Sequence, residues 1–233
     1  MRRRASGGSG GRQTTDRAVR LGGISGLLYV LLFIPAYVVG SPDMPDPASN
    51  EQGVAAYFDE VATFLFFNGT LSIFAAFFFV WFLGALHGIL RSAEEEAGWF
   101  SSVALAGGVV FVTLAWAGVA VEISYPATLG RFLDFEPDAQ VVFFTLALAS
   151  WLYHFCQLGT AAMVSATSLI ALETGVLPRW LALAGFAVAL LALLHFLVPL
   201  LAALVGMLWV AVVSVLMLMG LVGGPRAARQ PAR

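Results

Sequence analysis

Six small or polar residues repeat along the apolar run that begins at Ala139. They lie at steps of four, three, four, four and three and are Ser150, His154, Gln157, Ala161, Ser165 and Ser168. Because residues three and four apart share one face of an α-helix, these side chains form a single small, polar face, and Cys156 falls off it. Such a face either packs against another helix, hydrogen-bonding across the contact, or lines a cavity through His154 and Gln157.

Three further residues place polar groups in apolar segments, and they are Glu122, His195 and Asn68. With His154 and Gln157 they form a candidate polar cleft that opens to the outside of the membrane, since ionisable groups in membrane spans are rare and mark functional sites. The alternative is that Glu122 reaches the membrane surface and that both histidines donate to backbone carbonyls. The sequence favours this alternative, because a carboxylate near the end of a span reaches water at little cost.

Catalytic and metal-binding signatures are absent from the sequence. It has no H-E-x-x-H motif, no paired intramembrane aspartates and no glycine loop that cradles phosphate before a helix. The single cysteine, Cys156, excludes an intrachain disulfide and a cysteine-based metal site. Axial ligation of a haem by His154 and His195 is the one cofactor arrangement left open. We therefore expect no catalytic residues, no metal and no cofactor, and the sequence favours a non-enzymatic role.

The composition is typical of a membrane protein. Of 233 residues, 60% are hydrophobic and 11% are charged, whereas a soluble domain has about 25% charged residues. Apolar runs of about 20 residues cross a bilayer core of about 30 Å. We predict an all-α polytopic membrane protein, a six-helix transmembrane bundle, with spans at 21–39, 62–90, 99–123, 139–172, 180–198 and 200–221. Pro199 divides the last apolar block, because proline breaks a helix.

Polar segments flank the predicted membrane domain, residues 18–222. Residues 1–17 are rich in Gly, Ser and Arg, so we predict a disordered, basic cytoplasmic tail, and residues 223–233 form a second cytoplasmic tail. Between the first two spans, Ser49 or Asn50 is a candidate N-cap for an amphipathic helix that leads into the second span. Tyr57 and Phe58 are the residues that would anchor this helix at the membrane surface.

The arginines predict the orientation of the chain. Eleven of the twelve basic residues lie in the two tails and in the loops near residues 91 and 179, and only Arg131 lies in a loop on the other side. The loops on that side carry acidic residues instead. By the positive-inside rule, both termini are cytoplasmic and the protein is a multi-pass protein of the plasma membrane.

One segment, "ETGVLPRWLALAGFAVALL" at Glu173–Leu191, carries a specific pattern. Its turn, G-x-L-P-R-W-L at Gly175–Leu181, resembles that of a group of uncharacterised actinobacterial six-helix integral membrane proteins of the domain-of-unknown-function type. The resemblance implies a six-helix membrane architecture. It implies no catalytic residue, substrate or cofactor.

Two functions fit these observations. The first is a non-enzymatic accessory, sensory or structural membrane component whose partners are the lipid bilayer and either a second copy or another membrane protein, but no nucleic acid. The glycine pairs Gly22/Gly26 and Gly84/Gly88 suit such helix contacts. The alternative is a small-solute or lipid-binding permease that uses the outward-facing polar cleft. We expect the first function, and a solvent-accessible pocket that joins Glu122 with His154 or His195 would favour the second.

Overall fold

The structure is a computed structural model that describes residues 9–38, 51–94, 98–129 and 138–222. Every regular element in these ranges is a helix, which confirms the predicted all-α class. The helices are α1 (Ser9–Val38), α2 (Glu51–Ala93), α3 (Trp99–Leu129), α4 (Ala139–Thr174), α5 (Arg179–Leu193) and α6 (Pro199–Leu218).

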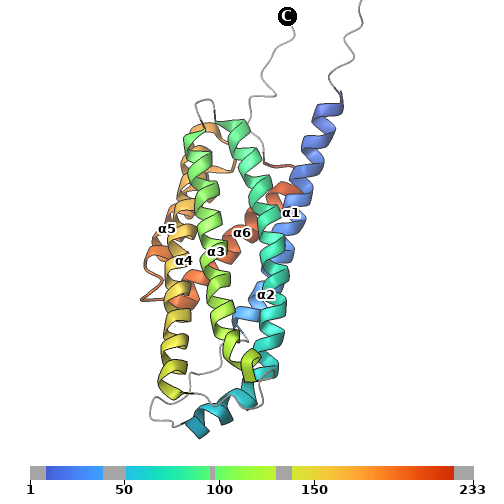
Figure 1. Ribbon diagram of the computed structural model, residues 1–233. Coiled ribbons are helices and arrows are strands. Elements are labelled where there is room, and N and C mark those ends of the chain that lie inside the picture. The colour runs from blue at the N-terminus through green and yellow to red at the C-terminus, as the bar shows by residue number, and fades with distance from the viewer. Residues whose placement is uncertain (1–8, 39–50, 95–97, 130–137, 223–233) are drawn as a thin grey trace, which may run out of the picture.

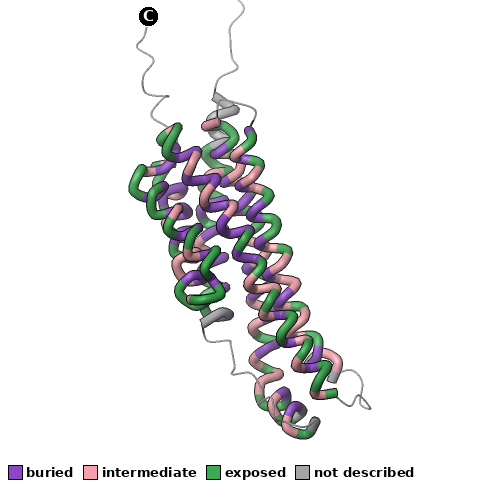
Figure 2. The backbone as a smooth tube through the Cα atoms, turned by 90° about the vertical axis from the view of Figure 1, so that its left-hand side faces the viewer, coloured by how far each residue is buried: buried purple, intermediate pink, exposed green. Residues whose placement is uncertain are grey.

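The six helices form a closed ring of neighbours (Figure 1). Each helix contacts the next one along the chain, and α6 returns to contact α1. The largest cluster of buried apolar side chains lies inside this ring and draws on all six helices. Figure 2 shows the same arrangement as buried positions that alternate with exposed ones along each helix.

Five of these helices, α1, α2, α3, α4 and α6, are long and apolar enough to cross a membrane. Helix α5 has 15 residues, a length of about 22 Å at 1.5 Å per residue. Large apolar side chains remain exposed around the bundle, among them Phe67, Phe144 and Leu208. This surface is compatible with a location in lipid, because apolar side chains need no burial there.

The described charged residues gather at the two ends of the bundle. At one end, where α1, α3 and α5 begin, the basic residues are Arg17, Arg20, Arg91 and Arg179, and we call it the arginine end. At the other end, where α2 and α4 begin, the residues are acidic and are Asp59, Glu60 and Asp138, and we call it the acidic end. The middle of the bundle therefore has almost no charge, and Glu122 is the exception.

The first four helices are longer than their predicted spans, and the difference is largest for α1 and α2. Helix α1 begins at Ser9, so residues 9–17, which we predicted to be disordered, are helical, whereas both extreme tails lie outside the described residues. Helix α2 is continuous from Glu51 to Ala93 and joins the predicted lead-in helix to the second span. Both differences have one reason: once a helix is nucleated, each added residue gains one backbone hydrogen bond.

The start of α2 packs beneath α3 and α4. Phe58 is fully buried, and its ring centroid lies 4.2 Å from that of Tyr125 on α3. Val54 and Val142 belong to the same buried cluster. The prediction that Phe58 anchors this segment at a membrane surface is therefore wrong, because the ends of α3 and α4 offer an apolar surface that buries the ring more completely.

A turn separates α5 from α6 part-way along α4 (Figure 1). The chain breaks before Pro199, the predicted place of the break, and α6 begins at Pro199, but α5 ends at Leu193 and not at residue 198. The backbone N–H groups of Leu194 and His195 donate to the carbonyl groups of Leu190 and Ala192. The chain thus satisfies these N–H groups locally while it stops the helix before the proline, whose ring would clash with a preceding helical turn.

Helices α3 and α4 contact each other backbone to backbone at two glycines. A Cβ atom on Gly107 would lie 2.6 Å from the backbone nitrogen of Met163 and 2.7 Å from the carbonyl oxygen of Gly159. A Cβ atom on Gly159 would lie 2.5 Å from the backbone nitrogen of Phe111. A side chain at either position would force the two helices apart, so this contact requires glycine.

The two predicted glycine pairs have different environments. Gly22 and Gly26 are buried and pack on Ala85 of α2 and Ser214 of α6, respectively. Gly84 and Gly88 are exposed, and a Cβ atom on either would meet no described atom within 4 Å. The first pair therefore makes helix contacts within the described bundle, and the second pair makes none there.

We predict that Gly159→Ala lowers the free energy of unfolding by about 1–3 kcal/mol, the usual cost of overpacking a tight contact. Gly84→Ala is the matched control, since it adds the same methyl group to open space on a helix. Thermal unfolding of the purified protein in detergent measures both variants. Equal midpoints for Gly159→Ala and the wild type would contradict the backbone contact between α3 and α4.

The turn between α2 and α3 is closed by Glu94. Its Oε1 accepts a hydrogen bond from the backbone N–H of Phe100 at 3.0 Å, and its Oε2 accepts one from that of Ser101 at 3.1 Å. These N–H groups belong to the first turn of α3, where no helical carbonyl can reach them. Desolvation opposes ionisation, but these hydrogen bonds and the nearby Arg91 outweigh it and lower the pKa of Glu94.

We predict a pH-dependent cost for Glu94→Gln. Because folding lowers the pKa of Glu94, its ionised cap stabilises the fold above its ordinary pKa of 4.5 and is lost as the pH falls through the lowered value. At pH 7 the variant should lose about 1 kcal/mol, the value of a helix cap, and in acid the difference from the wild type should shrink. Thermal unfolding in a pH series measures this, with Glu60→Gln as control. A constant difference at every pH would contradict the capping role.

Candidate functional site

The polar face of α4 is divided by the end of α5. Towards the arginine end, Ser168 lies against Gly185 of α5, and Ala161 shares a small buried cluster with Ala189 and Ala192. Towards the acidic end, α5 has stopped, and Ser150 and His154 face the α5–α6 turn and a pocket instead. Of the two alternatives for this face, packing against a helix therefore holds for the first half and lining a pocket for the second.

The two histidines meet at the α5–α6 turn. Nδ1 of His154 and Nδ1 of His195 lie 2.9 Å apart, so one ring donates a hydrogen to the other. His195 is 4% exposed, and Phe196 packs edge-on against the ring of His154. The expectation that both histidines donate to backbone carbonyls is wrong. The third histidine, His87, is the one whose Nδ1 lies 3.1 Å from a backbone carbonyl oxygen, that of Ser101.

This geometry bears on haem ligation. Two nitrogens on opposite sides of a metal lie about 4 Å apart, at roughly 2 Å per bond. The Nδ1 atoms of His154 and His195 contact each other directly at 2.9 Å, so these two nitrogens do not hold a metal between them. In the part of the chain that the structure describes, no three His, Cys, Asp or Glu side chains are grouped closely enough to hold a metal ion.

A pocket of about 370 Å³ surrounds this histidine pair, and we call it the histidine pocket. It is lined by Phe33, Ala36, Asn68, Ser72, Val119, Glu122, Ser150, Tyr153, His154, His195, Phe196 and Pro199. Four of the five residues of the predicted polar cleft are thus brought together from α2, α3, α4 and the α5–α6 turn. Gln157 is the fifth, and it does not line this pocket.

Glu122 is the acidic member of the histidine pocket. The hydroxyl of Tyr153 donates to its Oε2 at 2.7 Å, which joins α3 to α4 across the pocket. No described arginine pairs with Glu122, because all of them lie at the arginine end. Glu122 also lines a second pocket of about 320 Å³ that extends to Asp138, at the acidic end. The carboxyl group therefore lies between the two pockets.

Asn68 supplies a polar group from α2. Its Oδ1 is buried and has no hydrogen-bond partner among the described residues. The neighbouring turn of α2 is held against α3 by Trp116, whose indole Nε1 donates to the carbonyl oxygen of Ser72 at 2.6 Å. A buried acceptor without a partner is costly, and Asn68 is the residue that brings such an acceptor from α2 to the lining of the pocket.

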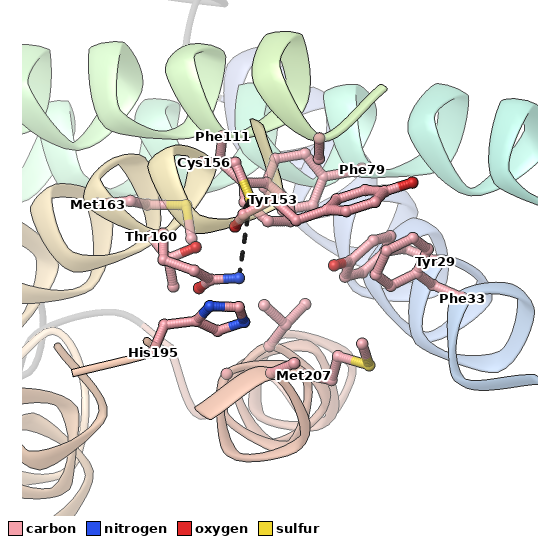
Figure 3. Close-up of a pocket in the computed structure, with 15 residues that line it drawn as sticks. Tyr29, Phe33, Phe79, Phe111, Tyr153, Cys156, Thr160, Met163, His195 and Met207 are labelled. Atoms are coloured by element: carbon pink, nitrogen blue, oxygen red, sulfur yellow. Dashed lines mark hydrogen bonds between the residues drawn. The ribbon is translucent and has the colours of Figure 1, made fainter. Parts of the chain in front are cut away.

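Gln157 lines a third and much smaller space, of about 40 Å³, at the centre of the helix ring (Figure 3). We call this space the aromatic cavity. Nε2 of Gln157 lies 3.8 Å from the sulfur of Cys156, which lines the same cavity. Cys156 was expected to point away from this face, but the flexible amide of Gln157 reaches back to it. Tyr29 and Phe33 of α1 close the far side of the cavity.

Three residues line both spaces, and they are Phe33, Tyr153 and His195. They form the partition between the histidine pocket and the aromatic cavity. The smaller cavity, of about 40 Å³, has room for about three or four water molecules, at about 10–15 Å³ each. The larger pocket falls within the range of about 300–1,000 Å³ that is typical of small-molecule sites.

The sequence analysis missed Tyr153, although a signal was present. Tyr153 lies three residues after Ser150 and four residues before Gln157, which is the same helical spacing that defined the polar face. Its hydroxyl fixes Glu122, so it positions the acid of the pocket. Phe196 had no comparable signal, because its place depends on how the α5–α6 turn folds back on α4.

Comparison with known proteins finds no matching family model, no matching curated protein and no matching solved structure.

The pair of histidines predicts non-additive effects of mutation. In His154→Leu or His195→Leu, the remaining ring loses its partner, and the free energy of unfolding should fall by about 1–3 kcal/mol. The double variant leaves neither ring, so its cost should be smaller than the sum of the two by about 1 kcal/mol or more. Chemical unfolding of the four proteins in detergent measures this coupling. Strictly additive costs would contradict the direct contact.

Proposed function

We propose that this chain is a six-span plasma-membrane protein that binds a small solute from the outside in the histidine pocket, as a permease or as a solute-binding component. In this proposal the six spans place both termini on the cytoplasmic side of the membrane. The observation that carries the proposal is the pocket that joins Glu122 with His154 and His195. A packed bundle without such a pocket would have supported an accessory role instead.

The membrane location is supported by the five long apolar helices and by the charges at the two ends. Helix α5 is short, but the turn after it is also apolar, and Phe196 and Leu197 are exposed there. An apolar turn tolerates the hydrocarbon region when its backbone groups are bonded within the protein, as the N–H groups of Leu194, His195 and Leu197 are. Placing the arginine end in the cytoplasm satisfies the positive-inside rule.

The solute-binding role is supported by where the pocket lies. Many transporters bind their substrates near the middle of the membrane, where a helix is interrupted. Here the interruption is the α5–α6 turn, and it contributes His195, Phe196 and Pro199 to the lining. Glu122 lines both this pocket and the one that extends to Asp138, so the two pockets adjoin on the side of the acidic end, the outside in this orientation.

A second candidate function, an accessory membrane component, is favoured by one observation. Gly84 and Gly88 are exposed on α2 and contact no helix in the described part of the chain, although pairs of this spacing suit close helix contact. A second copy or another membrane protein would fill this place. The relation to actinobacterial six-helix proteins, indicated by Gly175–Leu181, agrees with either role and stays a prediction.

Cysteine labelling tests the pocket. In a Cys156→Ser background, we expect Ser150→Cys to react with a small membrane-impermeant thiol reagent added outside intact cells, because residue 150 lines the pocket. The matched control is Ser168→Cys, which lies on the same face of α4 but is 1% exposed beneath α5. It should stay unlabelled until the protein is unfolded.

Labelling at residue 150 that is as slow as at residue 168 would contradict solute access and would favour the accessory role. Labelling of residue 150 only when the reagent enters the cytoplasm would contradict the orientation. Equal expression of the two variants, measured in the same membranes, shows that a difference in labelling comes from access.

A further inference from the structure

The charge in the histidine pocket is unbalanced. Glu122 is the acid among its lining residues, and none of the arginines in the described ranges lines it; the sequence contains no lysine. The hydrogen bond from Tyr153 satisfies one carboxylate oxygen but brings no positive charge. An ionised carboxylate in a low-dielectric space is stabilised by a cation, so the pocket favours a positively charged occupant over a neutral or negative one.

The hydrogen-bond acceptors that line the pocket also favour a positively charged occupant. Asn68 lines the same pocket as Glu122, and its Oδ1 is a buried acceptor without a described partner. The hydroxyl of Ser72 lies on the same helix, one turn further along, and also lines the pocket. An ammonium group donates up to three hydrogen bonds and accepts none, which matches a carboxylate and an unused amide oxygen.

The aromatic residues that line the pocket favour an organic cation over a metal ion. Phe33, Phe196 and Tyr153 place aromatic rings around the pocket, and rings attract organic ammonium groups through their faces. The described residues offer no group of three His, Cys, Asp or Glu ligands for a metal ion. At about 370 Å³, the pocket also has far more space than one ion needs.

The approach to the pocket carries a second carboxylate. The neighbouring pocket of about 320 Å³ is lined by Asp138 at the acidic end and by Glu122 at its other limit. This pocket therefore carries two carboxylates, and it shares one of them, that of Glu122, with the histidine pocket. Clefts lined by one sign of charge raise the local concentration of the opposite charge.

We propose that the histidine pocket binds a small organic ammonium ion, an amine with an apolar substituent, with the charged nitrogen at Glu122 and Asn68 and the apolar part among the aromatic rings. This inference rests on the proposed function and names its class of solute. His154 and His195 bond to each other, so the pair closes the pocket at the α5–α6 turn and leaves the cation to the carboxylate.

The test uses protection of Ser150→Cys, in the Cys156→Ser background of the full-length protein in lipid nanodiscs. Three probes share one ring and differ in charge: benzylamine, benzyl alcohol and benzoate. We expect benzylamine to slow labelling of the cysteine at concentrations about tenfold lower than those of the other two, the effect of one charged hydrogen bond. Glu122→Gln should remove this preference, and Glu60→Gln, at an exposed acid of α2 outside the pocket, should keep it.

The outcomes separate this inference from the proposed function. If Ser150→Cys reacts but the three probes protect it equally, or if Glu122→Gln retains the preference, the pocket is open and the ammonium proposal is overturned. If Ser150→Cys does not react at all, the proposed function and this inference both fail. Labelling of the Glu122→Gln variant without any probe shows that its pocket is still folded, because glutamine keeps an acceptor for Tyr153.

Discussion

The position of the α5–α6 turn is the constraint on which the rest of this structure depends. The apolar block from residue 179 to residue 218 is too long for one span and breaks before Pro199. Because α5 ends at Leu193, it covers only the half of α4 that lies towards the arginine end. The other half of α4 has the same polar face but does not pack against α5. The α5–α6 turn lies opposite it and places His195 against His154.

Close contacts on the other side of α4 hold this arrangement in place. The backbone approach at Gly107 and Gly159 holds α4 directly against α3. The hydrogen bond from Tyr153 to Glu122 then crosses the same helix pair nearer the acidic end. The α3–α4 pair is therefore joined by backbone contact in one half and by a side-chain hydrogen bond in the half beside the histidine pocket.

Much of the fold follows from periodicity and composition. Apolar runs predict the helices, and the break at Pro199 and the shared face of α4 follow from proline geometry and helical spacing. The extent of α5 did not follow, because its apolar sequence continues to Val198 and nothing local marks Leu193 as the end. Four of the five candidate cleft residues lie together, but the fifth, Gln157, points to Cys156. Side-chain packing decides this orientation, and the spacing of residues along a helix does not predict it.

The pairing of the histidines could not be predicted for a related reason. His154 and His195 are separated by 41 positions, and their contact depends on how far α5 extends before the chain turns. One more helical turn would carry His195 past His154 by about 5 Å. The single length of α5 therefore decides both the contact and the pocket around it.

The most direct measurement of the central claim is a scan of nitroxide spin labels along the polar face of α4, at residues 150, 154, 161, 165 and 168. Collision with a water-soluble nickel complex and with oxygen reports whether each site meets water, lipid or protein. The account predicts water access at 150 and 154 and protection from both reagents at 161 and 168, where α5 covers the face. Protection at all five positions, or oxygen access without nickel access at 150 and 154, would contradict it.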